Sequence, residues 1–484
     1  MFNPVVAMVI GIVVMMGLII FSRMHAFPSL IIAAILIAVL AMPFGPEGAK
    51  ISSLTACVGV VTKGFGNTMA SIGIVIGFGC IMGIFLEKSG AAKMMALTIL
   101  KGVGVKNCDI MLGITGLVVS IPVFCDSAFV ILSSLAKEFS RLTKKSMVWL
   151  GGLLGMGLYI THFMVPPTPG PLAVVGTFQS NGINIDLGLF IICGLLISIP
   201  LFVFAVVLFR YFGKKYPDLV VPYEIDRSKY TANQLKVLDR IAEKQKRNED
   251  LVTEDFADLL AAEKLPSATL SFATLLIPIV LIFANTLVSQ ISSLNGTAIS
   301  DIVRFFGQPV VALFISLCMG AYLLCSTYDN KTCVALMQDA CRDAGPIVFI
   351  TASGGALGAV INATGAASMM ADAIVSTGVP GILVPIIIGV VMRFPQGSGT
   401  TAMITGSAII APMIGTLGIN PYLAGLALCL TTMCPSYLND SYFHVVTNFS
   451  GMDIKTSLRT WSVGSILVPA FGSVIFCILS IFIH

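Results

Sequence analysis

Five ionisable side chains interrupt stretches of the sequence that are otherwise apolar, and they are the first candidates for chemistry. They are Asp126, His162, Arg393, Asp440 and His444. An ionisable group inside a membrane costs about 2.5–3.5 kcal/mol on insertion scales, so it is retained where it faces a cavity, a partner or a substrate. We therefore expect these residues to serve a site for a charged ligand or to carry protons.

The two carboxylates are the candidates for coupling to an ion gradient. Asp126 and Asp440 are our candidates for proton transfer, because a carboxylate can relay a proton by changing its protonation state. Asp440 with Asn439, Ser441 and unwound backbone carbonyls is equally compatible with Na⁺ coordination. The structural alternative is that each carboxylate caps a broken helix. The sequence does not choose between these roles.

Short polar residues and flexible backbone surround the ionisable groups. Free N–H groups and partial positive charge at helix N-termini provide a site for a carboxylate. Three alternatives stay open: Arg393 ends a helix at the interface by snorkelling, His162 is a satisfied core histidine, and small residues at 396–401 serve helix packing. The candidates for substrate binding are Ser127, His162, Thr168, Gly170, Arg393, Gln396, Gly397, Ser398, Thr400, Asn439 and Ser441.

The elements that hold these residues are expected to lie in a lipid bilayer. The chain is 56% hydrophobic and 11% charged, and its mean hydropathy is +0.96, whereas a soluble domain is about 25% charged. Eleven acidic and eleven basic residues fall between Arg210 and Lys264, which indicates an aqueous loop. No charge occurs from Met1 to Ser22, so the N-terminus is predicted to be a first transmembrane helix rather than a signal peptide.

Several other classes of protein find no support in the sequence. The net charge is only +4 and no basic cluster interleaves with aromatic residues, so we expect no nucleic-acid partner. The twelve cysteines show no paired CxxC spacing and are interpreted as small core residues. No HExxH, GxSxG or Walker glycine motif is present. We therefore expect neither a metal nor a cofactor, and a membrane-embedded enzyme is a remote alternative.

Apolar runs and proline positions predict the arrangement of spans. A transmembrane helix needs about 20 apolar residues, and charge-free runs of that size occur at 4–22, 26–46, 64–86, 187–209, 305–328, 344–371, 373–392 and 460–483. Two further runs, 146–185 and 394–439, are about twice that length and contain several prolines. Since proline removes a backbone donor and clashes with the preceding turn, we predict broken or re-entrant helices there.

The two halves of the chain resemble each other. The sequence from Gly83 to Met95 (GIFLEKSGAAKMM) returns at 358–370 as GAVINATGAASMM, and Pro122 and Pro166 have counterparts further along the second half. Paired interruptions in two halves indicate the binding site of a transporter. We predict an all-α polytopic membrane protein with two structural repeats. Similarity alone does not fix their relative orientation, and we favour inverted repeats.

Charge also suggests a division of the chain and an orientation. The expected parts are a first membrane half (1–212), a charged loop (213–265) and a second membrane half (266–484). The loop has helical spacing, and we interpret it as a connector between the repeats rather than a regulatory site. A second basic cluster is formed by Lys137, Arg141, Lys144 and Lys145. The positive-inside rule places both charged segments in the cytoplasm.

Three motifs resemble the gluconate permease (GntP) family of the ion-transporter superfamily. They are THFMVPPTPGP at 161–171, RFPQGS at 393–398 and NDSYF at 439–443, and the likeness covers most of the chain outside the charged loop. The resemblance implies uptake of sugar acids or other small carboxylates with protons. It also implies a scaffold domain, two helical hairpins, an elevator-type motion and a homodimer.

The chain also departs from the gluconate-type members of that family. Those members have His where this chain has Thr168, and a SHVNDSGFW-like string where it has SYLNDSYFH at 436–444. Tyr437, Tyr442 and His444 are therefore expected around the site. Bulkier groups there predict a ligand smaller than a six-carbon sugar acid, or one with fewer hydroxyls.

The resulting hypothesis is a multi-pass protein of the inner (plasma) membrane that imports a small hydroxycarboxylate or sugar acid by proton symport. Two or more cations carried with a monoanion would couple uptake to the membrane potential, which supplies about 2.3 kcal/mol per charge per 100 mV, whereas one proton would make uptake electroneutral. Na⁺ symport or anion exchange by the same fold is the alternative. A channel is less compatible with intramembrane carboxylates at two sets of broken helices.

Overall fold

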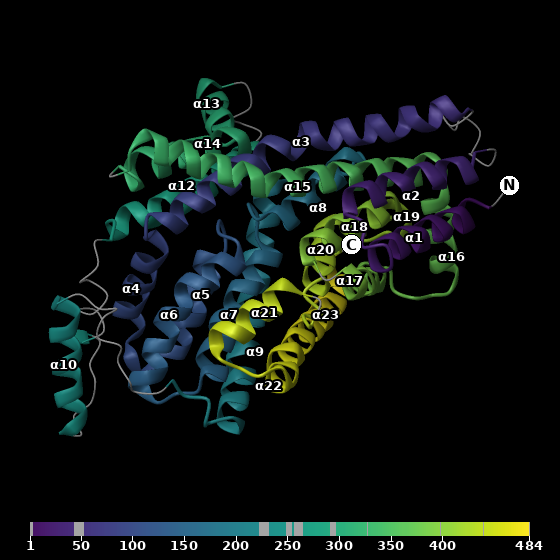
Figure 1. Cartoon of the computed structure of the whole chain (residues 1–484). Coiled ribbons are helices and arrows are strands. Elements are labelled where there is room, and N and C mark those ends of the chain that lie inside the picture. The colour runs from purple at the N-terminus through teal and green to yellow at the C-terminus, as the bar shows by residue number, and fades with distance from the viewer. Residues whose placement is uncertain are drawn as a thin grey trace.

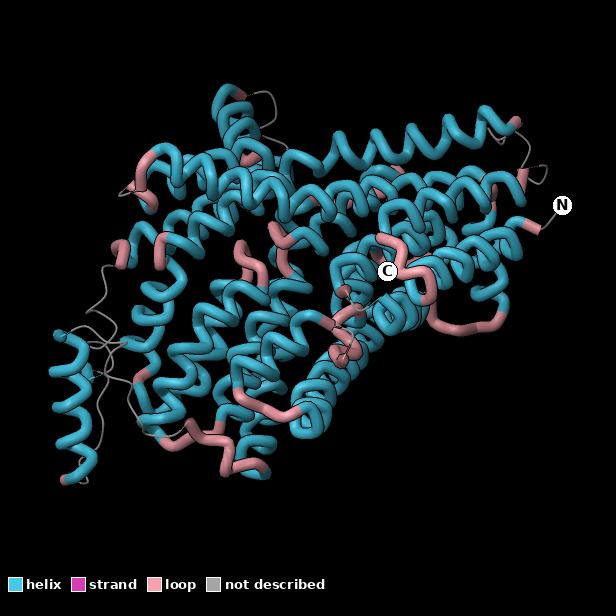
Figure 2. The backbone as a smooth tube through the Cα atoms, in the orientation of Figure 1, coloured by secondary structure: helices cyan, strands magenta, loops and turns pink. Residues whose placement is uncertain are grey.

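The computed structural model confirms a polytopic helical protein. Over the residues that it describes, the chain forms helices and no β-strand (Figures 1 and 2). Six helices in this part are long and apolar enough to cross a membrane, or nine if each of three bent pairs is one span. The described residues are 3–42, 53–221, 232–247, 254–255, 265–290, 297–326, 328–396, 398–438 and 440–483.

Ten helical segments precede the charged loop. In order they are α1 (Pro4–Ile20), α2 (Ala26–Leu40), α3 (Leu54–Lys88), α4 (Ala91–Val103), the 3₁₀ turn η1 (Val105–Asn107), α5 (Cys108–Val119), α6 (Cys125–Thr143), α7 (Met147–Met164), α8 (Pro169–Ser180) and α9 (Leu187–Lys215).

The loop contains α10 (Ala232–Lys246), which fits its helical spacing, and the remaining helices follow it. They are α12 (Ala268–Gln290), α13 (Ala298–Phe306), α14 (Pro309–Met319), the π-helical turn η4 (Gly320–Leu324), α15 (Asn330–Ala363), α16 (Ala366–Ser376), α17 (Leu383–Gln396), α18 (Gly399–Ile410), the 3₁₀ turn η5 (Ala411–Met413), α19 (Ile414–Leu417), α20 (Pro421–Thr431), α21 (Ser441–Ser450), α22 (Ile454–Ser457), the π-helical turn η6 (Leu458–Ser462) and α23 (Val463–Phe482).

Three predictions about spans were wrong. The run 373–392 is not one helix, because α16 ends before Gly378, which has a positive φ of 72°, and α17 begins only at Leu383. The run 305–328 is divided at Gly307, where α13 and α14 meet at 61°. The third error is the omission of α12, whose apolar sequence has a mean hydropathy of 2.2 and gave a clear signal.

The long helices α3 and α15 lie side by side (Figure 1). Small residues allow this approach, because a β-carbon on Gly64 would come within 2.6 Å of the β-carbon of Ala359. Each helix is followed by a glycine in the left-handed conformation, Gly90 with a φ of 81° and Gly365 with a φ of 73°, and then by a shorter helix. The matching phrases at 83–95 and 358–370 therefore adopt the same local structure.

The two long charge-free runs are broken, as predicted from their prolines. The run 146–185 forms α7 and α8, with a break at 165–168 that contains Pro166 and Pro167. The run 394–439 contains α18, η5, α19 and α20, and a break at 432–440 separates α20 from α21. A further break at 120–124 separates α5 from α6. Backbone groups that leave a helix at such breaks need partners within the protein.

Helices differ in how much of their surface the protein covers. The α7–α8 segment is 94% buried over its most apolar window, whereas the corresponding value for α9 is 33%. On α9 the side chains of Leu196, Ile199, Val203 and Val207 recur at helical spacing and are exposed. In a bilayer, this stripe faces lipid, and α7 lies in the protein interior.

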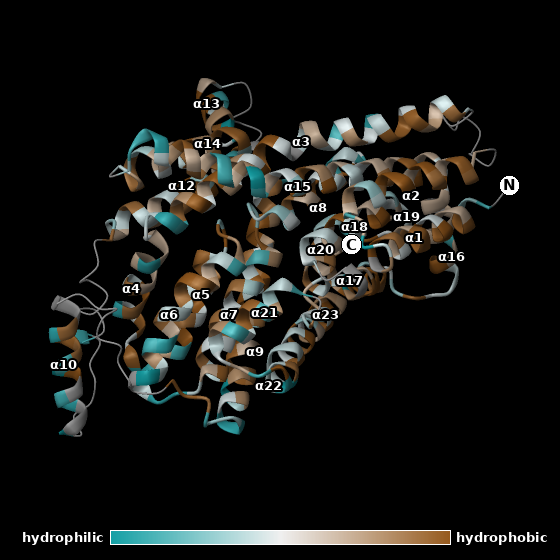
Figure 3. Cartoon of the chain, viewed as in Figure 1, coloured by the Kyte–Doolittle hydropathy of each residue, from teal (hydrophilic) through white to brown (hydrophobic). Residues whose placement is uncertain are grey.

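Hydrophilic residues lie at several places on the helices, among them the region of α13 and the end of the molecule where α6 and α9 terminate (Figure 3). There the fully buried carboxylate of Asp109 on α5 accepts Arg210 Nε at 2.7 Å, Trp149 Nε1 at 3.1 Å and Lys145 Nζ at 3.3 Å. The backbone N–H of Met147 also donates to the carbonyl of Leu219 beyond α9. The connection between α6 and α7, which holds Lys144 and Lys145 of the basic cluster, therefore packs against the start of the charged loop, so both lie at the same end of the molecule.

Candidate functional site

Two of the helix breaks, from different halves of the chain, pack against each other. A β-carbon on Gly170 of α8 would lie 2.1 Å from the methyl carbon of Met403 on α18. A β-carbon on Gly399, at the start of α18, would lie 2.1 Å from the Phe163 ring on α7. The α7–α8 break is therefore in direct contact with the α17–α18 break.

The other two breaks also meet across the halves. Asp126, in the first turn of α6, is close enough to Asp440 and to Ser441 for electrostatic interaction with both. The neighbouring rings of Phe129 and Tyr442 pack edge to face at 6.1 Å. Asp126 is partly exposed, and among the described residues no basic side chain lies within ion-pair distance of it. Its carboxylate is therefore accessible and unneutralised.

A buried ion pair lies where these segments converge. Arg393 near the end of α17 donates from Nη2 to Asp440 Oδ2 at 2.6 Å and to the Tyr159 hydroxyl at 3.0 Å. The exposed fraction is 1% for Arg393 and 4% for Asp440. Asp440 also accepts the backbone N–H of Tyr442 on Oδ1 at 3.2 Å and so caps α21. The structural and the chemical roles expected for Asp440 therefore coexist.

The break at 432–440 is held by the C-terminal helix. The Ser436 hydroxyl contacts Asp440 Oδ2 and accepts a hydrogen bond from Trp461 Nε1 at 2.8 Å. The Ser436 backbone is satisfied as well, since its N–H donates to Ser465 Oγ at 2.9 Å and its carbonyl accepts Ser462 Oγ at 2.7 Å. These bonds fix the position of the segment that presents Asp440.

Aromatic rings enclose the ion pair. Tyr159 stacks on Tyr442 with ring centroids 5.1 Å apart and packs against Trp461 at 5.5 Å and Phe163 at 4.5 Å. The Tyr442 hydroxyl donates to the carbonyl of Gly155 at 3.0 Å. Water is thus excluded from the pair on this side, which strengthens its electrostatic interaction.

More than half of the Arg393 guanidinium is unused. Both hydrogens of Nη2 have acceptors, but Nε and Nη1 are buried and have no hydrogen-bond partner in the described part of the chain. A guanidinium has five N–H donors in a planar fork, so three of them are left without acceptors. Buried donors of this kind are costly unless a ligand satisfies them. A carboxylate, which accepts two parallel hydrogen bonds from such a fork, fits this requirement.

Other predicted residues cap the helices at the breaks. Thr168 is buried at the N-cap of α8, and its hydroxyl donates to the carbonyl of Val165 at 2.7 Å. Ser398 caps α18 and accepts hydrogen bonds from the backbone N–H and the hydroxyl of Thr401. Thr400, in the first turn of α18, is partly exposed and adjoins the space beside Gly170. Thr400 is thus better placed than Thr168 to donate to a ligand.

The remaining predicted residues have mixed positions. His162 is buried beside Phe124 and Phe163, and its Nδ1 has no partner in the described part of the chain. Ser127 follows Asp126 on α6 and is partly exposed. Gly397 and Asn439 lie outside the described residues, as does the side chain of Gln396.

The structure adds three residues that sequence reasoning missed, Tyr159, Ser436 and Trp461. Tyr159 and Trp461 lie in apolar stretches, where an aromatic residue is usually a core residue. Ser436 follows Pro435, and a single serine there gave no signal of its own. Two of the aromatic residues expected around the site are already engaged. Tyr437 donates to the Phe394 carbonyl at 2.7 Å and stacks on its ring, and Tyr442 belongs to the buried stack. His444 is exposed and its ring contacts the Leu438 carbonyl.

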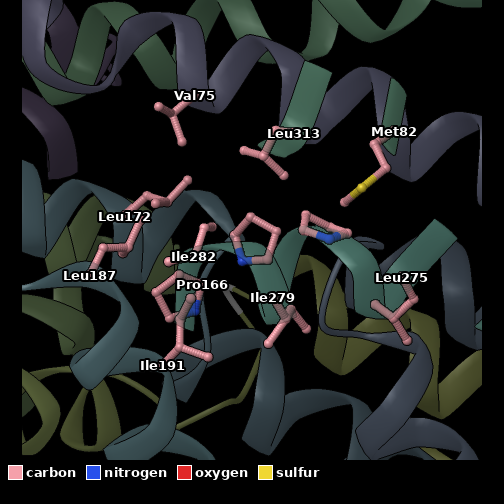
Figure 4. A pocket seen from close by; sticks show the side chains of 12 residues that line it. Val75, Met82, Pro166, Leu172, Leu187, Ile191, Leu275, Ile279, Ile282 and Leu313 are labelled. Atoms are coloured by element: carbon pink, nitrogen blue, oxygen red, sulfur yellow. The ribbon is translucent and has the colours of Figure 1, made fainter. Parts of the chain in front are cut away.

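An apolar pocket lies beside the α7–α8 break (Figure 4). Its lining has no charged or hydrogen-bonding side chain, so it does not offer a site for an anion. The lining residues are Val75, Met82, Pro166, Pro167, Leu172, Leu187, Ile191, Leu275, Pro278, Ile279, Ile282 and Leu313. In the part of the chain that the structure describes, no group of three His, Cys, Asp or Glu residues could hold a metal ion.

Long apolar helices, interrupted where an ion pair is buried between two halves, define a polytopic membrane permease rather than an enzyme. The sequence matches the model of the GntP family of permeases over residues 3–482, and the chain belongs to that family. It is therefore a multi-pass protein of the plasma membrane, as the apolar runs predicted.

Known proteins support this assignment over nearly the whole chain. An uncharacterised permease of Haemophilus influenzae is 36% identical, with 97% of this chain and 91% of the relative covered. A gluconate permease of Bacillus licheniformis is 25% identical, with 99% and 100% covered. The crystal structure of the YdaH transporter of Alcanivorax borkumensis, whose topology is described as unusual, superposes with a TM-score of 0.61 at 14% identity, covering 93% of this chain and 96% of that one.

Proposed function

We propose that this permease imports a small hydroxycarboxylate of the sugar-acid class together with protons. The observation that carries the proposal is the buried Arg393 guanidinium at the meeting of the helix breaks, with three N–H donors for which the described residues offer no acceptor. A carboxylate satisfies these donors and balances their charge. The relative named as a gluconate permease supports a polyhydroxy acid as the substrate class.

Hydroxyl groups of the substrate find partners in the adjoining helix ends. The Cα of Thr400, in the first turn of α18, lies 3.8 Å from a β-carbon built on Gly170, and Ser441, the first residue of α21, lies close to Asp126. Free N–H groups at helix N-termini favour anions and oxygen acceptors. We assign the carboxylate of the substrate to Arg393 and its hydroxyls to Ser127, Thr400 and Ser441.

We further propose that residues 1–212 and 266–484 are inverted structural repeats joined by the charged segment 213–265. The equivalent ends of α3 and α15 support this, and so do the contacts between helices. Helix α6 packs on α21, and α8 packs on α18. If α6 is the equivalent of α18 and α8 the equivalent of α21, these two contacts are the same contact made once by each repeat. We also propose that transport involves an elevator-type movement in a homodimer. Cross-linking of paired cysteines across the α3–α15 and α6–α21 contacts during transport would test which of these contacts move.

The substrate and the coupling ion are tested together by thermal stability. The purified protein is heated with three- to six-carbon hydroxycarboxylates at several pH values, in Na⁺ or in K⁺. A ligand at 100 times its Kd adds about 2.7 kcal/mol of stability. Stabilisation that increases at low pH and is the same in Na⁺ and K⁺ supports proton symport. A response restricted to Na⁺ would replace it by Na⁺ symport, and no response to any carboxylate would contradict the proposed substrate class.

A further inference from the structure

A proton and Arg393 compete for the negative charge of Asp440. Oδ2 takes the Arg393 Nη2 donor at 2.6 Å and the hydroxyls of Tyr159 and Ser436, whereas among the described residues Oδ1 takes only the backbone N–H of Tyr442. Protonation of either oxygen would neutralise the carboxylate and remove the counter-charge of the guanidinium. Asp440 therefore either balances the charge of Arg393 or carries a proton, but does not do both.

We propose that the carboxylate of the substrate replaces Asp440 as the counter-ion of Arg393, and that the displaced Asp440 takes up the transported proton. This inference rests on the proposed function, because it requires an anionic substrate. The step makes an O–H bond on Asp440 with a proton from solution, and the guanidinium remains charged. The unused Nε–H and Nη1–H donors of Arg393 provide the side on which the incoming carboxylate binds before Asp440 leaves.

Charge balance makes the two events obligatory partners. The empty site holds Arg393 as a cation and Asp440 as an anion, and the loaded site holds the same cation, the substrate anion and a neutral Asp440. Counted over the buried groups alone, without the partly exposed Asp126, both sets are neutral overall. Binding of the anion alone would leave a net negative charge in a buried site, and protonation of Asp440 alone would leave a net positive charge. Both uncoupled states bury an unpaired charge and are disfavoured.

The surroundings of Asp440 are suited to this exchange. The titratable and charged groups that face it are Arg393 on α17, Tyr159 on α7, Asp126 and Cys125 on α6, and Tyr442 on α21. Arg393 alone carries a positive charge in this set. The hydroxyl of Tyr159 has a second acceptor, the carbonyl of Met433, also at 3.4 Å. It can turn to that carbonyl when Asp440 becomes neutral, so its own hydrogen bond is kept.

Binding of gluconate and of glycerate, a six-carbon and a three-carbon hydroxycarboxylate, tests the exchange in the purified full-length protein. We expect Asp440 to take up one proton per bound anion, so wild type should take up one proton more than Asp440→Asn, measured by calorimetry in buffers of different ionisation enthalpy. This proton should make the Kd rise by up to about tenfold per pH unit as the pH increases. In Asp440→Asn the competing anion is absent, so binding should be tight at all pH values and take up no proton at this site. Proteoliposomes with Asp440→Asn should exchange substrate but not accumulate it with a pH gradient.

Asp453→Asn is the matched control, since Asp453 also caps a helix, α22, and is exposed. It should behave as wild type. Asparagine is a good N-cap, so α21 should persist in Asp440→Asn. If Asp440→Asn does not fold, Tyr159→Phe is the second variant. It keeps the Asp440 carboxylate but removes one hydrogen-bond donor to its ionised form. Protonation of Asp440 then becomes easier, so the pH midpoint of substrate binding should rise.

Two results would overturn the exchange while leaving the proposed function intact. The first is a folded Asp440→Asn that retains the full proton uptake of wild type. The second is a folded Asp440→Asn that no longer binds either carboxylate. An unchanged midpoint in Tyr159→Phe would also speak against it. If wild type binds no carboxylate at all, the proposed function itself fails and the exchange falls with it.

Discussion

Phe163 occupies the space in which a side chain on Gly399 would stand. A β-carbon on this glycine would come within 2.1 Å of the Cζ atom of the ring. Phe163 also connects Gly399 to the ion pair. Its ring packs against that of Tyr159, with centroids 4.5 Å apart, and the Tyr159 hydroxyl accepts a hydrogen bond from Arg393. The start of α18 and the guanidinium are thus linked through two aromatic rings.

Gly399→Ala should therefore destabilise the protein and impair binding. Over-packing of this kind costs about 1–3 kcal/mol, because the ring must shift from its place. The melting temperature and the Kd for a carboxylate report the two effects. Gly77→Ala in α3 is the control, since a β-carbon there meets nothing within 4 Å. If Gly399→Ala is as stable as Gly77→Ala and binds equally well, the close contact between α18 and α7 does not exist.

Asp126→Asn should change the number of protons that accompany the substrate. Asp126 is partly exposed and has no basic partner among the described residues, so we expect it to carry a second proton beside that on Asp440. Two protons with a monoanion move one net charge, which is worth about 2.3 kcal/mol per 100 mV. Wild-type proteoliposomes should accumulate substrate in response to a potential alone. Asp126→Asn should respond to a pH gradient only, and equal responses to the potential in both proteins would refute the second proton.

Asp109→Asn should reduce stability without altering transport by the folded protein. The fully buried carboxylate holds Lys145 and Arg210, and its loss leaves two cations without their counter-ion. Removing one partner of a buried pair costs about 3–5 kcal/mol, but both cations are partly exposed and can be hydrated, so we expect roughly 1–3 kcal/mol. Thermal unfolding measures the loss. A change in KM, with unchanged melting temperature, would mean that this end of α5 serves the substrate instead.

Thr400→Val should weaken substrate binding and leave the fold intact. Valine keeps the shape of threonine but cannot donate to a substrate oxygen in the first turn of α18. A hydrogen bond between neutral groups contributes about 0.5–1.5 kcal/mol, so KM should rise roughly two- to tenfold. The control is Thr62→Val in α3, whose hydroxyl, within the part of the chain that the structure describes, bonds only to its own helix. Equal KM values for the two variants would place the substrate elsewhere.

The membrane character of the chain and its broken helices could be predicted because both depend on local sequence. Apolar run length identifies a span, and prolines such as Pro166 and Pro435 identify where a helix cannot continue. The boundaries were less accurate. Gly378 and Gly307 ended helices inside runs that read as continuous, because glycine among apolar residues has no strong signal of its own.

The composition of the site was only partly predictable. Arg393 and Asp440 were marked by their charge, but nothing in the sequence indicated that they pair with each other, since this depends on how α17 packs against the α20–α21 break. Alternatives for Arg393 included an interfacial position, whereas it is 1% exposed in the interior. Tyr159 could not be predicted for the same reason, because its hydroxyl has a role only once α7 lies beside the ion pair.

The hydrogen bond between Trp461 and Ser436 gives the protein a built-in optical reporter. The chain has only two tryptophans. Trp149 lies at the end of the molecule where α6 and α9 terminate, and its indole N–H bonds to Asp109, whereas Trp461 bonds to the serine that touches Asp440. Indole emission responds to changes in such hydrogen bonds and in nearby charge. Fluorescence from Trp461, isolated in a protein that carries Trp149→Phe, would thus follow the charge state of the site in real time and without any added label.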